Sequence, residues 1–147
     1  MKRSSHHAGQ TLFEIIISVA VIAVILTALV SAVTAALRYG QASRNRSRAV
    51  KYAQEGLELA RALRDTAGWD LFLTYSGSGT KRWCVDESGV WTADSGNGCP
   101  IASGSPFGRT VDITWNTPLM SVDVAVAWGE KDASSTIHLQ TYFTKWK

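Results

Sequence analysis

The feature that most constrains this chain is an apolar run at residues 15–37, IIISVAVIAVILTALVSAVTAAL, which contains no charge, glycine or proline. As an α-helix rising about 1.5 Å per residue, the run is roughly 35 Å long, enough to cross a hydrocarbon core of about 30 Å. Its polar members can each donate a hydrogen bond to a carbonyl one turn back, so none forbids insertion. They are Ser18, Thr27, Ser31 and Thr34. The run predicts a transmembrane helix or its equivalent.

A helical pattern continues beyond this run. Small and apolar residues recur at spacings of three, four and seven, with charged and amide residues between them. They are Ala42, Ala49, Ala53, Leu57, Ala60 and Leu63. No proline precedes Pro100, and Gly40 and Gly56 are single interruptions that each cost a helix about 1 kcal/mol. We predict one helix from about residue 11 to residue 65, with an amphipathic second half.

The remainder of the chain predicts a small β-rich head. Residues 66–108 are rich in glycine and serine and predict a loop with one short hairpin that turns at residues 87–89. Three later stretches alternate apolar and polar residues, which predicts half-buried strands at residues 111–115, 122–128 and 137–143. Short connections predict an antiparallel meander, whose apolar face the helix stripe would cover. The opposite face would carry Asp112, Asp123, His138 and Gln140.

The two cysteines, Cys84 and Cys99, both lie in the loop-rich region, and their spacing lacks the CxxC pairs of a zinc site. If this part of the chain is exported, we expect a disulfide. Closing a loop of about 15 residues would stabilise the head by roughly 3 kcal/mol. Two free buried thiols are the alternative. No metal site is predicted.

Residues that could suggest catalysis form no recognisable motif. His138 has no serine or cysteine placed beside it by a nucleophile motif, and the glycines of SGSGT precede no Lys-Ser/Thr pair. We therefore expect no enzymatic activity and no cofactor. The formal charge of +3 indicates no strongly basic surface. Basic and aromatic residues coincide at residues 81–83 and 145–147, which leaves DNA binding by stacking as a minor alternative.

The segment before the apolar run contains the most specific motif. AGQTLFEIIISVAVIAVI, at residues 8–25, resembles the N-terminal signature of type IV prepilins and of the pseudopilins of type II secretion systems. In that family a prepilin peptidase cuts after a glycine, and the fifth residue of the mature chain is a glutamate. The resemblance implies cleavage between Gly9 and Gln10, N-methylation of Gln10, and an assembly role for Glu14. Gln10 stands where the family usually has phenylalanine.

A physical argument supports the role of Glu14. A carboxylate at the edge of the hydrocarbon is costly, so it is expected to face a partner. Cleavage would create an amino group on Gln10, and in this family the amine of one subunit is thought to meet the glutamate of its neighbour. The alternative is a juxtamembrane acid in a shallow, hydrated position.

The resemblance covers roughly the first 65 residues by motif and the sheet only in general layout. It implies an α+β, pilin-like fold and a structural subunit, of the minor kind, in a type IV pilus or a type II secretion pseudopilus. The expected parts are a leader (1–9), a transmembrane and filament-core helix (10–37), its amphipathic continuation (38–66), a Gly/Ser-rich loop with a hairpin (67–108) and a β-meander (109–147).

The resemblance also implies partners and a location. The partners are other pilin subunits, the prepilin peptidase, an inner-membrane platform protein with its assembly ATPase, and the lipid bilayer before assembly. The chain would cross the cytoplasmic membrane once, with its N-terminus cytoplasmic and its head extracytoplasmic, before it enters a surface filament or a periplasmic pseudopilus. The count of basic residues opposes this orientation, because two precede the apolar run and five follow it closely. We give the motif precedence.

Two alternatives remain open. A conventional signal peptide would be cut at the far side of the apolar run, near Thr34. The run is longer than the usual removable core, and the helical pattern continues through that site, so we disfavour this alternative. The alternative function is that of a single-pass membrane-anchored or secreted binding domain that does not assemble into a filament.

Overall fold

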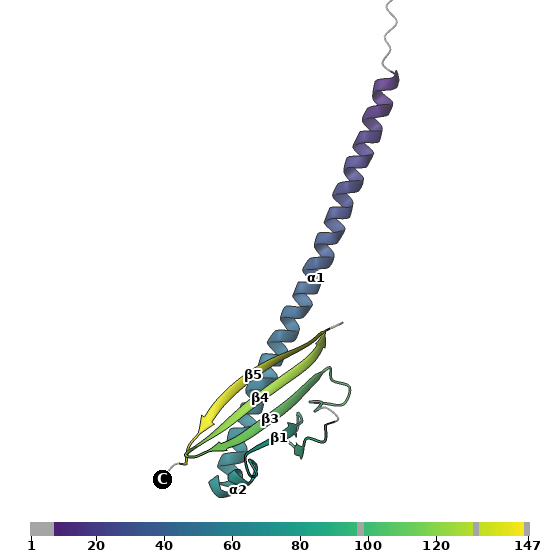
Figure 1. Ribbon diagram of the computed structural model, residues 1–147. Helices are drawn as coiled ribbons and strands as arrows, with labels where there is room; N and C mark the ends of the chain where they lie inside the picture. The colour runs from purple at the N-terminus through teal and green to yellow at the C-terminus, as the bar shows by residue number, and fades with distance from the viewer. Residues whose placement is uncertain (1–7, 97–98, 131–132, 146–147) are drawn as a thin grey trace, which may run out of the picture. The chain divides into compact units, whose positions relative to one another are not determined.

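The computed structural model describes residues 8–96, 99–130 and 133–145, and the chain divides into two units, Met1–Ser43 and Arg44–Lys147. One helix, α1 (Ala8–Ala67), contributes to both units (Figure 1). The first unit is helical throughout its described part. The predicted long helix is therefore present, with ends close to those expected from the pattern.

The second unit contains the C-terminal part of α1, a short helix α2 (Trp69–Thr74) and one antiparallel sheet of five strands (Figure 1). The strand order is β2-β1-β3-β4-β5. The strands are β1 (Thr80–Val85), β2 (Trp91–Ala93), β3 (Phe107–Asn116), β4 (Leu119–Glu130) and β5 (Ala133–Phe143). The predicted meander is confirmed as β3-β4-β5, and the expected α+β arrangement of a long N-terminal helix and an antiparallel sheet is present.

The predicted hairpin is also confirmed, as β1 and β2, and the structure adds its place in the sheet. β1 pairs with β3 in antiparallel register, with Trp83 opposite Val111. The prediction of a loop from residue 67 to residue 108 was wrong at α2. Phe72 of α2 is fully buried and packs edge-on against Phe143 of β5, with the ring centroids 5.7 Å apart. This long-range packing stabilises a helix that is too short for its periodicity to be detected.

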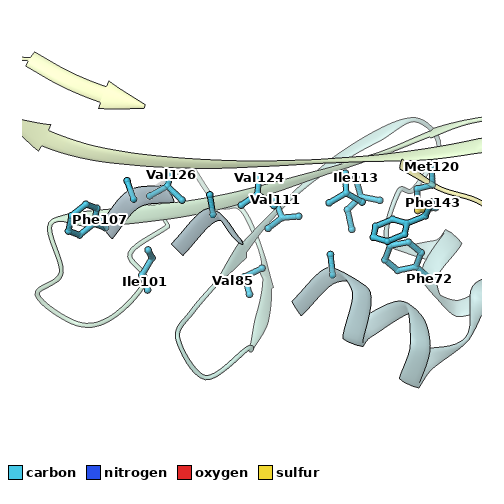
Figure 2. Close-up of a cluster of buried hydrophobic side chains, with 14 of the residues drawn as sticks. Phe72, Val85, Ile101, Phe107, Val111, Ile113, Met120, Val124, Val126 and Phe143 are labelled. Carbon is cyan, nitrogen blue, oxygen red and sulfur yellow. The ribbon is translucent and has the colours of Figure 1, made fainter. Parts of the chain in front are cut away.

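The core of the second unit lies between the sheet and α1. Three residues of the predicted helix stripe, Ala49, Ala53 and Ala60, are fully buried, because their small side chains allow the sheet to approach α1 closely. The sheet contributes side chains at alternating positions, as a half-buried strand requires. They are Val111, Ile113, Val122, Val124 and Val126. In Figure 2, Phe72 and Phe143 pack together at one end of this core, and Phe107 lies at the other.

Candidate functional site

The first unit presents an apolar helical surface. The large apolar side chains of residues 12–37 are exposed, including Phe13, Val24 and Leu37 at 67%, 68% and 64%. This part of α1 is long and apolar enough to cross a membrane. Large exposed apolar surfaces of this kind mark sites of interaction with membranes or other proteins.

The polar side chains within this surface are satisfied by the helix itself, as predicted. Each hydroxyl donates to a main-chain carbonyl three or four residues earlier. The pairs are Ser18 Oγ to Glu14 O (2.7 Å), Thr27 Oγ1 to Val24 O (2.9 Å), Ser31 Oγ to Ala28 O (2.7 Å) and Thr34 Oγ1 to Ser31 O (2.9 Å). Because these bonds satisfy the hydroxyl donors, they lower the free-energy cost of placing the four hydroxyls in an apolar environment.

Glu14 is the one charged residue in this surface. Its side chain is exposed, and its carboxylate forms no ion pair with any residue in the described part of the chain. The helix begins at Ala8, so the predicted cleavage site, Gly9 and Gln10, lies in its first turn. Positions 10 and 14 are one helical turn apart. Cleavage, methylation and the assembly role of Glu14 stay predictions.

The second pair of predicted site residues, Cys84 and Cys99, lies at disulfide distance. Their Cα atoms are 5.0 Å apart and their Sγ atoms 1.90 Å. An oxygen of Asp94 lies within 4.8 Å of both sulfurs. Sulfurs that are bonded to each other do not act as thiolate ligands, and Asp94 already accepts a hydrogen bond from the Gly96 main-chain N–H at 2.8 Å. The geometry therefore favours a structural link between β1 and the segment before β3.

Arg109 is a key residue that the sequence analysis missed. Its side chain is fully buried, and its guanidinium donates to three main-chain carbonyls. The acceptors are Val85 O (from Nε, 3.0 Å), Tyr52 O (from Nη1, 3.1 Å) and Asp86 O (from Nη2). Glu55 of α1 lies 3.8 Å away. Burial lowers the pKa of this guanidinium, and the nearby Glu55 and Asp86 oppose that effect.

The contacts of Arg109 connect three elements: α1 through Tyr52, the end of β1 through Val85, and β3, on which Arg109 itself lies. A signal for this role was present in the sequence. Arg109 is two residues before Val111 and four before Ile113, so it occupies an inward-facing position of the strand alternation. An arginine at an inward-facing position of a strand predicts a buried guanidinium that donates hydrogen bonds to several acceptors.

The outer face of the sheet carries the polar residues expected there. Arg82 of β1 forms two hydrogen bonds to Asp112 of β3, both 2.7 Å, and this carboxylate raises the pKa of Arg82 through hydrogen bonding and charge. His138 Nδ1 lies 2.9 Å from Asp123 Oδ2, and His138 is exposed, as predicted. Asp112 and Asp123 are directly opposite each other on β3 and β4.

The aromatic and basic residues considered for DNA stacking are only partly available. Trp83 is half-buried, its indole N–H donates to Tyr75 O at 2.8 Å, and Lys81 Nζ lies 4.2 Å from the centre of its ring. The second aromatic and basic cluster includes Trp146 and Lys147, which lie outside the described residues. The side chain of Trp83 therefore makes its contacts within the head.

A groove of about 850 Å³ runs along α1 in the second unit. It is lined by charged residues of α1, including Lys51, Glu55 and Glu58, and by Glu87 from the turn between β1 and β2. Buried Arg109 also borders it. Arg61 lines it as well, so acidic and basic groups are equally represented in the groove.

Comparisons of the chain with models of protein families, with curated proteins and with solved structures gave no match.

Proposed function

We propose that this chain is a structural subunit, of the minor kind, of a type IV pilus or a type II secretion pseudopilus. The observation that carries the proposal is the exposed apolar helix of residues 12–37, which contains one carboxylate, Glu14, near its start. Before assembly this surface would lie in the bilayer, and after assembly it would pack against the same segment of other subunits. Both environments are apolar, so the same side chains suit each of them.

In this proposal Glu14 makes assembly selective. A carboxylate is costly in lipid, but it is stabilised when an opposite charge lies beside it in a medium of low dielectric constant. After cleavage behind Gly9, the amino group of Gln10 on a neighbouring subunit would provide that charge. The pair would favour the assembled state over the free subunit in lipid, because only the assembled state contains both partners.

The proposal includes partners and an orientation. A prepilin peptidase would cut on the cytoplasmic side, and a platform protein with an assembly ATPase would transfer the subunit from the membrane to the filament. The head would lie outside the cytoplasm. The disulfide distance between Cys84 and Cys99 supports this orientation, because disulfides persist mainly in oxidising compartments.

N-terminal sequencing of the protein purified from membranes tests the proposal. We expect a chain that begins at Gln10, and the mass of its first peptide would report methylation. A membrane-anchored or secreted binding domain that never assembles would instead begin at Met1 or beyond Thr34. Either of those results would contradict the proposed function.

A further inference from the structure

A group of basic residues directly follows the apolar part of α1. Between Glu14 and Glu55 the chain contains no acidic residue, and all its basic residues in this interval come after Leu37. They form what we call the basic segment: Arg38, Arg44, Arg46, Arg48 and Lys51. Beyond the basic segment, acidic and basic residues are mixed along α1. Positive charge is therefore concentrated next to the apolar surface.

The charges of the basic segment are not compensated within the chain. All five of its residues are exposed, and in the part of the chain that the structure describes none of them forms an ion pair. Other exposed basic groups differ in this respect, because Arg61 pairs with Glu58 and Lys145 with Asp70. The positive charges of the basic segment are therefore available to an anionic group from outside the chain.

Tyr39 indicates the level at which the apolar surface ends. It follows Leu37 by two positions, and its side chain is 77% exposed. Tyrosine is enriched at membrane–water interfaces, where the ring contacts the apolar region and the hydroxyl contacts water. With residues 12–37 in a bilayer, Arg38 and Tyr39 would lie in the headgroup layer, which extends about 5–8 Å beyond the hydrocarbon core.

Helix geometry brings two further arginines within reach of this layer. Along α1, Arg44 and Arg46 lie about 10 and 13 Å beyond Leu37. The charge of a membrane surface acts over about 8–10 Å at physiological ionic strength, and a long arginine side chain can extend back toward the headgroups. Arg48 and Lys51 lie farther out, at about 16 and 21 Å. The members closest to the headgroups are therefore Arg38, Arg44 and Arg46.

These three arginines point in different directions around α1. At about 100° per residue, Arg46 lies about 80° from Arg38 around the helix axis, and Arg44 lies about 120° from Arg38 in the opposite sense. A protein that packs on one side of α1 could contact one or two of them. A headgroup layer surrounds a helix that crosses it, so it can contact all three. The arrangement favours lipid over a single acidic protein surface.

We propose that Arg38, Arg44 and Arg46 bind the headgroups of anionic phospholipids on the side of the membrane where the head lies. A guanidinium forms paired, charge-assisted hydrogen bonds to phosphate oxygens, and the net negative charge of these headgroups is attracted to a basic segment beside a membrane helix. The inference rests on the proposed function for the placement of residues 12–37 in a bilayer. To that function it adds a class of lipid.

The lipid contact would also hold α1 at a fixed depth. Glu14 lies roughly 35 Å from Leu37 along the helix, slightly more than the thickness of a hydrocarbon core of about 30 Å. Arginines bound to headgroups at one face of the bilayer would therefore keep Glu14 near the opposite face. A carboxylate is less costly there than at the centre of the bilayer.

Energy transfer from the full chain to labelled lipids tests the inference. Gln41 is exposed and lies within the same part of α1, so Gln41→Cys provides a site for a donor fluorophore, while the Cys84–Cys99 pair offers no free thiol. The protein is reconstituted in phosphatidylcholine vesicles with a trace of phosphatidylglycerol or phosphatidylcholine that carries an acceptor on its acyl chain. We expect phosphatidylglycerol to be enriched about fivefold around the label. The enrichment should fall toward unity at an ionic strength of about 1 M.

Two variants with the same change in net charge, both labelled through Gln41→Cys, provide the decisive comparison. Arg38→Gln combined with Arg44→Gln should lower the enrichment about threefold or more. Arg61→Gln combined with Lys145→Gln should leave it unchanged, because these two basic groups already pair with carboxylates of the chain. Equal enrichment in both variants overturns the proposal. Equal transfer to the two lipids in the original chain does so as well.

Two other results assign the charges elsewhere and also overturn the proposal. If Lys2→Gln combined with Arg3→Gln removes the enrichment, and the change at Arg38 and Arg44 does not, then the N-terminal basic residues attract the lipid. If the original chain shows no enrichment, but loss of Arg38 and Arg44 weakens co-purification of differently tagged copies, then these arginines contact an acidic protein surface.

The lipid contact and the proposed function fail in distinguishable ways. Lipid enrichment around a chain that begins at Met1 and enters no filament supports the contact and overturns the filament role. A chain that begins at Gln10 and enters filaments, but shows no enrichment, overturns the lipid contact alone. Absence of enrichment, cleavage and filaments overturns both.

Discussion

Gly56 of α1 lies against Val124 of β4 with no space for a side chain between them. A Cβ atom at position 56 would lie 2.7 Å from Val124 Cγ1 and 3.1 Å from Arg109 Cδ. Val124 and Arg109 are both fully buried, so neither can move away easily. In the sequence Gly56 looked like an interruption that the helix tolerates. In the structure it allows the backbone of α1 to approach the sheet.

We predict that Gly56→Ala destabilises the head by about 1–3 kcal/mol, because overpacking exceeds the helix-propensity gain of about 1 kcal/mol. The measurement is denaturant unfolding of the detergent-solubilised protein, followed by tryptophan fluorescence. Gly40→Ala is the matched control, because it is also in α1 and a Cβ there meets nothing within 4 Å. Equal stability of the two variants would contradict the assigned close approach.

Arg109→Met should lower the free energy of unfolding by about 3 kcal/mol or more, because it leaves three carbonyls without their charged donor. Arg109→Lys should restore little of this loss, since an ammonium lacks the planar fork of a guanidinium. The exposed Arg82, which pairs with Asp112, provides a control. Arg82→Met should cost less than about 1 kcal/mol in the same unfolding experiment. Similar losses at both positions would argue against the role given to Arg109.

Cys84 and Cys99 should be oxidised in the native protein, so alkylation before reduction should label neither. Replacing both by serine should lower the free energy of unfolding by roughly 3 kcal/mol, the value expected for a loop of about 15 residues. The comparison is made between the variant and the original protein under non-reducing conditions. Free thiols detected in the purified native protein would rule out the link.

Glu14→Ala should leave membrane insertion and cleavage intact while reducing recovery of the chain with sheared filaments. Glu14→Lys should reduce recovery further, because it would place two positive groups together in a medium of low dielectric constant. If Glu14 only flanks a membrane helix, Glu14→Ala should be neutral or should improve insertion. Unchanged recovery of both processed variants would remove the main physical support for the assembly role.

Gly9→Leu should leave the full-length protein in the membrane fraction, because a peptidase that binds extended backbone at the cut site has little room there for a side chain. The readout is the mobility and N-terminal sequence of the membrane-bound protein. The amount of Gly9→Leu in membranes, compared with that of the original chain, controls for insertion. Normal maturation of this variant would overturn the assigned cleavage site.

Local patterns were sufficient to predict the main elements. Spacings of three and four predicted α1, and strict alternation predicted β3, β4 and β5, because both periodicities record which side chains of one segment share a face. The hydrogen bonds of Ser18 and its counterparts followed from helix geometry in the same way. Gly9, Gln10 and Glu14 were identified from a short motif, so their proposed roles still depend on sequence.

Tertiary structure alone decided the features that depend on residues distant in the chain. Three contacts join segments that are far apart in the sequence, and no periodic pattern within either segment predicts them. They are the pairing of β1 with β3, the burial of Phe72 against Phe143, and the hydrogen bonds of Arg109 to its three acceptors. The same holds for Gly56, whose importance comes from Val124 on another element. Sequence by itself determined the apolar helix and the alternating strands, because burial of one face imposes a period on the residues of each segment. It left undecided how close those faces approach and which polar groups meet, because both depend on packing in three dimensions.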